Sequence, residues 1–291
     1  MKLQRWQADL LLVITALLWG GTFVVVKNAV SVLAPEVIIA FRFSVAFLFL
    51  AVIFGKACRG HWRKALIPGS ILGVVLGVAF WTQTAGLQYT TPSTSAFITG
   101  LNVVFVALID ALILHRLPHG RVFLGILAAT GGLLILTWTG RVKFSPGDLL
   151  TLICALLFGL HIVLTSRFIH GRDPRAITVV QFAVVSVIAW AVLPLTKASF
   201  HLTHLNLLVL ILLGLFPTAI AFLLQTIAQK FTPPVHTAII LSLEPVFAAL
   251  SSLILGLDRL SCRLLLGGGL IFTGTILSSV EEAPRETEVQ V

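Results

Sequence analysis

Long apolar runs separated by short polar gaps occupy almost the whole chain. A helix of roughly 20 apolar residues crosses a hydrocarbon core about 30 Å thick, and each run is about that long. The pattern therefore predicts an all-α integral membrane protein, with too little chain between helices for a separate soluble domain. The ten transmembrane helices are expected at residues 9–27, 37–55, 65–87, 93–114, 120–139, 147–166, 176–195, 205–228, 235–256 and 263–280.

Composition agrees with a membrane protein. Hydrophobic residues make up 58% of the chain and charged residues 11%, whereas soluble domains carry about 25% charged residues. The net charge of +9 comes from residues in the gaps between apolar runs, so we expect no nucleic-acid partner. The three cysteines, Cys58, Cys154 and Cys262, have neither a CxxC nor a metal-binding spacing, and no metal or cofactor is expected.

Lysine and arginine predict the orientation in the membrane. With the N-terminus in the cytoplasm, 13 of these residues fall on the inner side and 6 on the outer side. Positive charge accumulates on cytoplasmic loops, so both termini of this multi-pass protein are expected in the cytoplasm of the cell (inner or plasma) membrane. The first apolar run has no small-residue cleavage site and is expected to be a retained helix. The polar segment 281–291 is expected to be a disordered cytoplasmic tail.

An internal repeat relates the two halves of the chain. A shift of 139 residues, which becomes 142 after a short insertion, aligns glycine, proline, glutamine and charged positions. Each half holds five predicted helices, and because five is odd the second half enters the membrane from the opposite side. The sequence thus predicts two inverted five-helix repeats, at 1–139 and 148–280, joined by a linker at 140–147. The aligned pairs include Asp9/Asp148, Gly20/Gly159, Phe43/Phe182, Phe80/Phe222, Gln83/Gln225, Thr90/Thr232, Phe105/Phe247, Gly125/Gly267 and Gly132/Gly274.

Several motifs carry a resemblance to a known family. They are ALLWGGTFVVVK at 16–27, Arg42–Phe43, ALLFG at 155–159, Gln181–Phe182 and LSLEPVFAALSSLILG at 241–256. Together they resemble the EamA-like members of the drug/metabolite transporter superfamily over about residues 9–280. The resemblance implies ten helices in two inverted repeats, a central cavity, and metabolite transport without ATP hydrolysis. One departure is that Asn102–Val103 stands where the second repeat has Glu244–Pro245, so a helix-breaking proline is missing from the first repeat.

Two charged residues inside predicted helices are the main candidates for a substrate site. Ionisable groups are costly in lipid and should face a cavity or a partner. Glu244 is either a proton site or contact for a cationic group, or a structural hydrogen-bond partner beside the helix break at Pro245. Arg42 either extends to the membrane surface or binds a substrate carboxylate through two hydrogen bonds. Asp110 is expected to form an interfacial ion pair with Arg116.

Polar and aromatic residues at mid-helix positions complete the predicted substrate site. The expected cavity set is Trp19, Thr22, Arg42, Trp81, Gln83, Asn102, His161, Gln181, Gln225 and Glu244. Trp81 and Gln83 are two residues apart and cannot share a narrow helix face. Small residues allow close contact between transmembrane helices, and with one proline they form the expected hinge or packing set: Gly20, Gly21, Gly125, Gly132, Gly159, Pro245, Gly267 and Gly274.

The function predicted from these features is secondary transport by alternating access through a cavity between the repeats. Because Arg42 and Glu244 carry opposite charges, an amino acid or similar zwitterion is the expected substrate, and export the expected direction. Its partners would be the small-molecule substrate, the lipid bilayer and protons. A flippase for an amphiphile or lipid-linked molecule is the alternative. An intramembrane enzyme is disfavoured, because no HExxH or paired-aspartate motif is present.

Overall fold

A computed structural model describes residues 3–115, 120–137, 145–196, 202–254 and 261–279 of the chain. Within these ranges the regular structure is all helical, and the helical segments form ten rods that correspond to the ten predicted helices. Most of the predicted linker, the polar tail at 281–291, and Arg116, the expected partner of Asp110, lie outside the described residues.

Proline residues mark the beginnings of many helices. Pro35, Pro92, Pro146, Pro174 and Pro234 each occupy the first helical position, where a missing N–H costs nothing. The helices are α1 (Arg5–Gly20), α2 (Thr22–Ala29), α3 (Pro35–Phe54), α4 (Trp62–Tyr89), α5 (Pro92–Gly100), α6 (Asn102–Leu114), α7 (Gly120–Thr137), α8 (Pro146–Phe168), α9 (Pro174–Thr196), α10 (His204–Gly214), η1 (Leu215–Ile220), α11 (Ala221–Ala228), α12 (Pro234–Leu241), α13 (Glu244–Ile254) and α14 (Cys262–Ser279).

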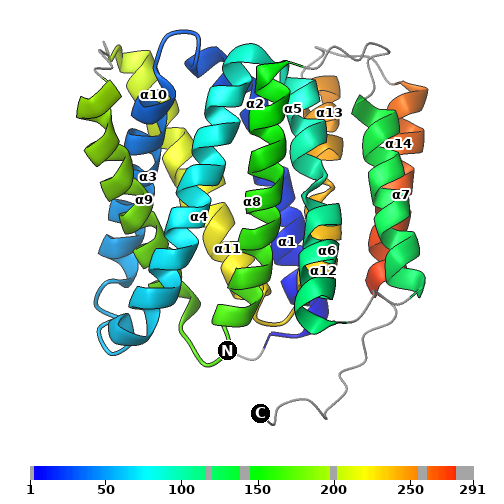
Figure 1. The fold of residues 1–291 in the computed structure, drawn as a ribbon, viewed down its shortest axis with the longest axis horizontal. Helices are drawn as coiled ribbons and strands as arrows, with labels where there is room; N and C mark the ends of the chain where they lie inside the picture. Colours follow the sequence, from blue (N-terminus) through cyan, green and yellow to red (C-terminus); the bar gives the residue numbers. More distant parts are fainter. Residues whose placement is uncertain (1–2, 116–119, 138–144, 197–201, 255–260, 280–291) are drawn as a thin grey trace.

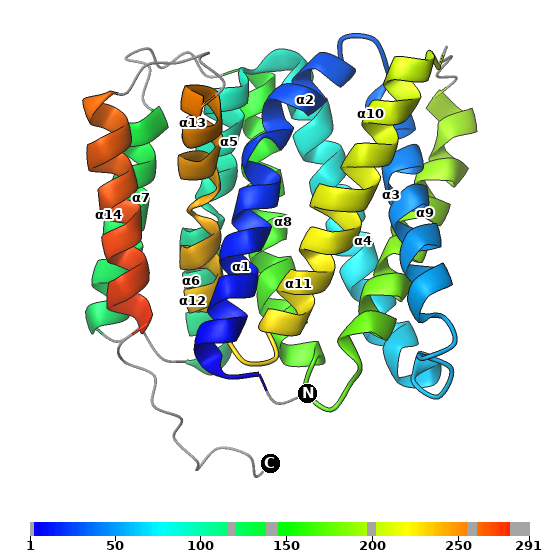
Figure 2. The same cartoon turned by 180° about the vertical axis from the view of Figure 1, so that it is seen from behind.

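These segments form one bundle of roughly parallel rods (Figures 1 and 2). Seven rods in the described ranges are long and apolar enough to span a bilayer, and three shorter apolar helices lie at Gly120–Ile135, Pro234–Leu250 and Cys262–Ser278. The rods α1 and α8 lie centrally, α7 pairs with α14 at one side, and α3 and α9 lie at the other. Helix α1 begins, and α14 ends, at the same end of the bundle.

Two rods are interrupted midway at equivalent repeat positions. One break separates α5 from α6 at Leu101, and the other separates α12 from α13 at Ser242 and Leu243. The first repeat has no proline at this point, yet its rod is still interrupted there. Each break lies beside a glycine of the other half: Gly159 faces the start of α6 and Gly20 faces α13. Close packing against these glycines is common to both breaks.

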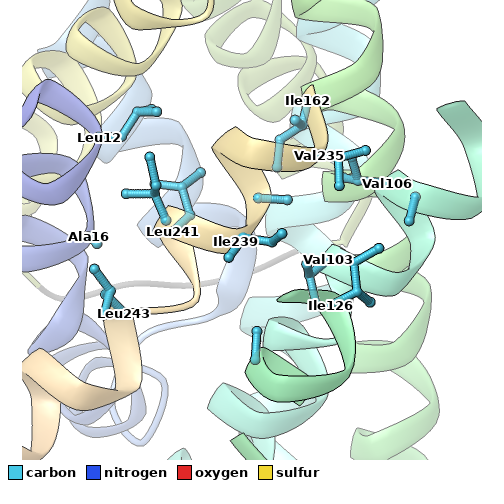
Figure 3. Packing of buried hydrophobic residues seen from close by; sticks show 14 of the residues in the cluster. Leu12, Ala16, Val103, Val106, Ile126, Ile162, Val235, Ile239, Leu241 and Leu243 are labelled. Atoms are coloured by element: carbon cyan, nitrogen blue, oxygen red, sulfur yellow. The ribbon is translucent and has the colours of Figure 1, made fainter. Parts of the chain in front are cut away.

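An apolar core fixes the broken rods against α1, α7 and α8 (Figure 3). Leu12 and Ala16 of α1 belong to the same buried cluster as Val103 of α6 and Ile239 of α12. All four residues are fully buried. The outer faces of the bundle carry large exposed apolar residues such as Val52 and Ile67. Those outer residues suit a lipid environment.

Contacts between the halves occur as exchanged pairs. Thr232 donates to Asp9 (3.3 Å), and its repeat counterpart Thr90 donates to Asp148 (2.6 Å). Gly20 packs against Phe247, while Gly159 packs against Phe105. In the pair α7 and α14, Gly125 faces the Gly274 carbonyl and Gly132 faces the Gly267 carbonyl. Each of these contacts between the halves is thus matched by a second contact between the repeat counterparts of the same residues.

Candidate functional site

A central cavity lies among α1, α2, α3, α4, α5, α8 and α11, where the breaks before α6 and α13 meet it. It encloses about 580 Å³ of space between atoms, including solvent at its mouth. The lining residues are Trp19, Thr22, Phe23, Val26, Arg42, Phe80, Gln83, Leu87, Thr99, Asn102, Phe158, His161, Ile162, Phe222, Gln225 and Glu244.

Arg42 lies in the cavity wall and is only 4% exposed. Its Nε donates a hydrogen bond to Thr218 Oγ1, and its guanidinium carbon lies 4.6 Å from the centre of the Phe80 ring. Thr218 belongs to the π-helical turn η1 and donates in turn to the Leu213 carbonyl (2.7 Å). Arg42 therefore does not extend to the membrane surface. The π turn positions it, and its remaining N–H groups are available to an anionic ligand group.

Glu244 is the first residue of α13 and lines the same cavity. A carboxylate is favoured at a helix N-terminus because the first backbone N–H groups carry partial positive charge. Glu244 and Arg42 both line this cavity. Among the described residues, none forms a hydrogen bond or ion pair with the Glu244 carboxylate. The cavity thus presents both signs of charge.

Aromatic rings form the apolar part of the wall. Trp19 lies against Phe222 with ring centres 5.0 Å apart, and the equivalent pair Phe158 and Phe80 is 5.4 Å apart. Phe80 and Phe222 also contact each other, at 5.7 Å. The Trp19 indole N–H donates to the carbonyl of Pro217 in η1 (2.7 Å). Tilted and edge-on contacts of this kind hold the rings in fixed orientations.

Polar lining groups are positioned by buried neighbours. His161 Nε2 lies 3.0 Å from Gln181 Oε1, and Gln83 donates to Thr99 (3.2 Å). Gln225 donates to Gln229 (3.1 Å) and keeps a buried Oε1 without a hydrogen-bond partner. An unpaired buried acceptor of this kind is costly, and a ligand donor in the cavity could satisfy it.

Eight of the ten residues expected at the cavity line it. Gln181 lies one layer behind and orients His161. Trp81 is elsewhere, in the cluster around Phe43, because two residues on a helix are about 200° apart and Gln83 takes the cavity face. Asp110 forms its ion pair with Arg167 (3.4 Å). Sequence reasoning missed Phe80, Phe158, Phe222 and Thr99, although the Phe80/Phe222 repeat pairing was a usable signal.

The expected packing glycines are placed as follows. Gly20, Gly125, Gly132, Gly159 and Gly274 all lie where an added Cβ would come within 3.0 Å of a neighbouring helix. Gly267 supplies the carbonyl that faces Gly132, and Pro245 is the second residue of α13. A Cβ added at Gly21 would meet nothing within 4 Å, and Gly21 separates α1 from α2.

The arrangement of the helices matches that of a known crystal structure. The TM-score is 0.78, with 95% of this chain and 97% of that chain covered at 19% identity. The sequence pattern of the EamA-like transporter family matches residues 6–138 and 145–280, once in each half. The chain belongs to the EamA-like transporter family. It is therefore a multi-pass membrane transporter of the drug/metabolite transporter superfamily and not an enzyme.

Curated relatives span nearly the whole EamA-like chain. A protein named "Uncharacterized transporter" from Archaeoglobus fulgidus is 31% identical over 277 residues, covering 95% of this chain and 87% of the relative. The "Uncharacterized transporter YyaM" of Bacillus subtilis is 24% identical, with 89% of each chain covered. Both names state transport and neither states a substrate.

Proposed function

We propose that this EamA-like protein is a secondary transporter for a small zwitterion, such as an amino acid with an apolar or aromatic side chain, and that it works in export. The observation that carries the proposal is the pairing of Arg42 and Glu244 in one aromatic-walled cavity. Arg42 is suited to a carboxylate, since a guanidinium can donate two parallel hydrogen bonds. Glu244 is suited to an ammonium group, and the rings of Trp19, Phe80 and Phe222 to an apolar side chain.

Two inverted five-helix repeats, at 1–139 and 148–280, supply the alternating-access mechanism in this proposal. The exchanged contact pairs, such as Thr232–Asp9 with Thr90–Asp148, support it. Transporters of this architecture bind substrate between the repeats near the membrane midplane. Phe43 and Phe182, which are repeat counterparts, contact each other at 5.6 Å, as residues beside a pseudo-two-fold axis should.

The cavity differs between its two ends, which indicates which side it faces. Val26 and Leu87 line it toward the end away from the start of α1. Their repeat counterparts, Thr165 and Gln229, do not line it. Gln229 instead donates to Ile162 O (2.8 Å) and Ser166 Oγ (2.9 Å). These bonds join α8 to α11 and close the end nearer the termini. With cytoplasmic termini, the conformation is outward-facing.

Reconstituted transport tests the proposed function. Proteoliposomes preloaded with unlabelled amino acids should accumulate the same labelled amino acid by counterflow, at least about tenfold above empty liposomes. Analogues lacking the carboxylate or the ammonium group should compete poorly, because each leaves a buried charge unpaired, which typically costs several kcal/mol. Movement of fluorescent lipid between leaflets without any zwitterion counterflow would instead favour the flippase alternative.

Reporter fusions test the proposed orientation. A reporter that is active only in the cytoplasm should be active when fused after Ser279, where α14 ends at the same end as the start of α1. A fusion in the connection between α2 and α3 should be inactive. An export-dependent reporter that is active after Ser279 would contradict both the cytoplasmic termini and the outward-facing assignment.

A further inference from the structure

A second hollow lies on the outer surface, away from the transport cavity. It is formed by the beginning of α4 and the connection from α8 to α9, and encloses about 890 Å³ including open solvent. Basic side chains line one part of it and apolar side chains the other. Its lining is Arg63, Lys64, Ile67, Pro68, Ile71, Phe168, His170, Gly171 and Arg172.

Arg172 is built into the wall of this groove. Pro68 has no N–H, so the carbonyl of Lys64 one turn earlier lacks its helical donor. Arg172 Nε donates to that carbonyl (3.2 Å), and its NH1 donates to the carbonyl of Phe168 at the end of α8 (2.8 Å). Gly171 has a positive φ of 71° and makes the turn possible. The guanidinium is thereby held in place with further N–H groups to spare.

The positive charge of the groove is not neutralised by the protein. Within the described residues, no carboxylate lies within ion-pair distance of Arg63, Lys64 or Arg172. The nearby Asp173 is held by Arg175, at 2.7 and 3.0 Å. Partial burial opposes its ionisation, but the hydrogen bonds and charge of Arg175 keep the pKa of Asp173 below its usual value. Asp173 is thus already paired with Arg175 and does not neutralise the charge of the groove.

The apolar part of the groove continues toward the membrane interior. Arg63, Ile67 and Ile71 are four residues apart and lie on one face of α4, with Arg63 beside the start of the helix at Trp62. Ile67 is 75% and Ile71 41% exposed. Charge therefore lies at the membrane surface, and apolar surface lies about one and two helical turns deeper, about 6 and 12 Å along the axis. Only an amphiphile with an anionic head and apolar chains matches this order.

We propose that this groove is a binding site for an anionic phospholipid. The phosphate accepts hydrogen bonds from Arg63, Lys64 and Arg172, and an acyl chain lies along Ile67 and Ile71. Basic pockets at the cytoplasmic surface are suited to such headgroups. The site is separate from the proposed transport cavity, because the two share no lining residue.

Lipid binding to purified protein tests the site, with phosphatidylglycerol as probe and native mass spectrometry as readout. Each Lys or Arg near an anionic lipid is worth about 1 kcal/mol, so Arg63→Gln/Lys64→Gln should weaken binding about 30-fold. Arg63→Lys/Lys64→Arg keeps both charges and should bind within about threefold of wild type. The matched control is Lys56→Gln/Arg59→Gln, which removes two exposed charges of the preceding connection outside the groove, and should also stay within about threefold.

Other measurements separate the lipid from other ligands. Phosphatidylcholine should bind at least about tenfold more weakly than phosphatidylglycerol. Inorganic phosphate should not raise the thermal unfolding temperature as the lipid does, and Ile67→Ser/Ile71→Ser should weaken lipid binding. Equal losses in the groove and control variants, equal binding of both lipids, or full stabilisation by phosphate would each overturn the proposal. None of these readouts depends on transport, so they stand apart from the test of function.

Discussion

Replacing Arg42 with glutamine is expected to reduce zwitterion counterflow at least about 100-fold, equivalent to about 2.7 kcal/mol. Charge-assisted hydrogen bonds contribute about 1.5–3 kcal/mol each. Among the described residues that line the cavity, Arg42 is the one lysine or arginine, and His161 is the one histidine. Arg42→Lys keeps the charge but loses the planar contact over Phe80, so partial activity is expected. Arg59→Gln, an exposed change, should have wild-type activity.

A double variant separates a substrate role from mutual neutralisation. If Arg42 and Glu244 serve mainly to balance each other, Arg42→Gln/Glu244→Gln should recover both thermal stability and transport. If they bind the two ends of the substrate, the double variant should be stable and remain inactive. Recovery of transport in the double variant would remove both residues from substrate recognition.

Glu244→Gln alone also tests proton coupling. Glutamine keeps the shape and one acceptor but cannot release a proton. A coupling role predicts loss of pH-driven accumulation with exchange of substrate retained, whereas a stable Glu244→Ala variant with full accumulation would exclude Glu244 from the mechanism. The rates are compared in proteoliposomes with and without an imposed pH difference.

The positions of the helices could be predicted from the sequence because two independent signals coincide. Apolar length marks the membrane spans, and proline at Pro35, Pro146 and Pro174 marks where helices begin. The break at Leu101 is less clearly marked, since Gly100 precedes it but no proline stands there. The start of α6 also packs against Gly159 of the other half. Local sequence carries no record of such a contact.

The polar part of the candidate site could be predicted better than the apolar part. Buried polar groups stand out in a membrane helix because lipid cannot satisfy them, which is how Arg42, Gln83 and Glu244 are found. Phe80 and Phe158 do not stand out, since an apolar ring can face lipid, core or cavity equally well. Trp81 illustrates the difficulty: its indole is amphipathic, yet it packs in the cluster around Phe43.

Alanine substitutions at two adjacent glycines in α7 are expected to change the stability of the protein in opposite directions. A Cβ at Gly132 would lie 2.5 Å from the Gly267 carbonyl oxygen and 3.0 Å from the Ile271 amide nitrogen of α14, whereas nothing lies within 4 Å of a Cβ at Gly131. Backbone atoms cannot rotate away as side chains do, so α7 and α14 must separate. Overpacking of this kind costs about 1–3 kcal/mol, while alanine at an open helix position gains up to about 1 kcal/mol over glycine.

Thermal unfolding in detergent measures the difference. Since 1 kcal/mol shifts the midpoint by about 2–4 °C in a chain approaching this size, Gly132→Ala should lower it by about 3–10 °C and Gly131→Ala should leave it unchanged or raise it. The contact is reciprocal, because a Cβ at Gly274 would lie 2.7 Å from the Gly125 carbonyl oxygen. Gly274→Ala should therefore resemble Gly132→Ala, and Gly269→Ala, with nothing within 4 Å, should resemble Gly131→Ala. Equal effects at all four positions would mean that α7 and α14 are not in direct backbone contact.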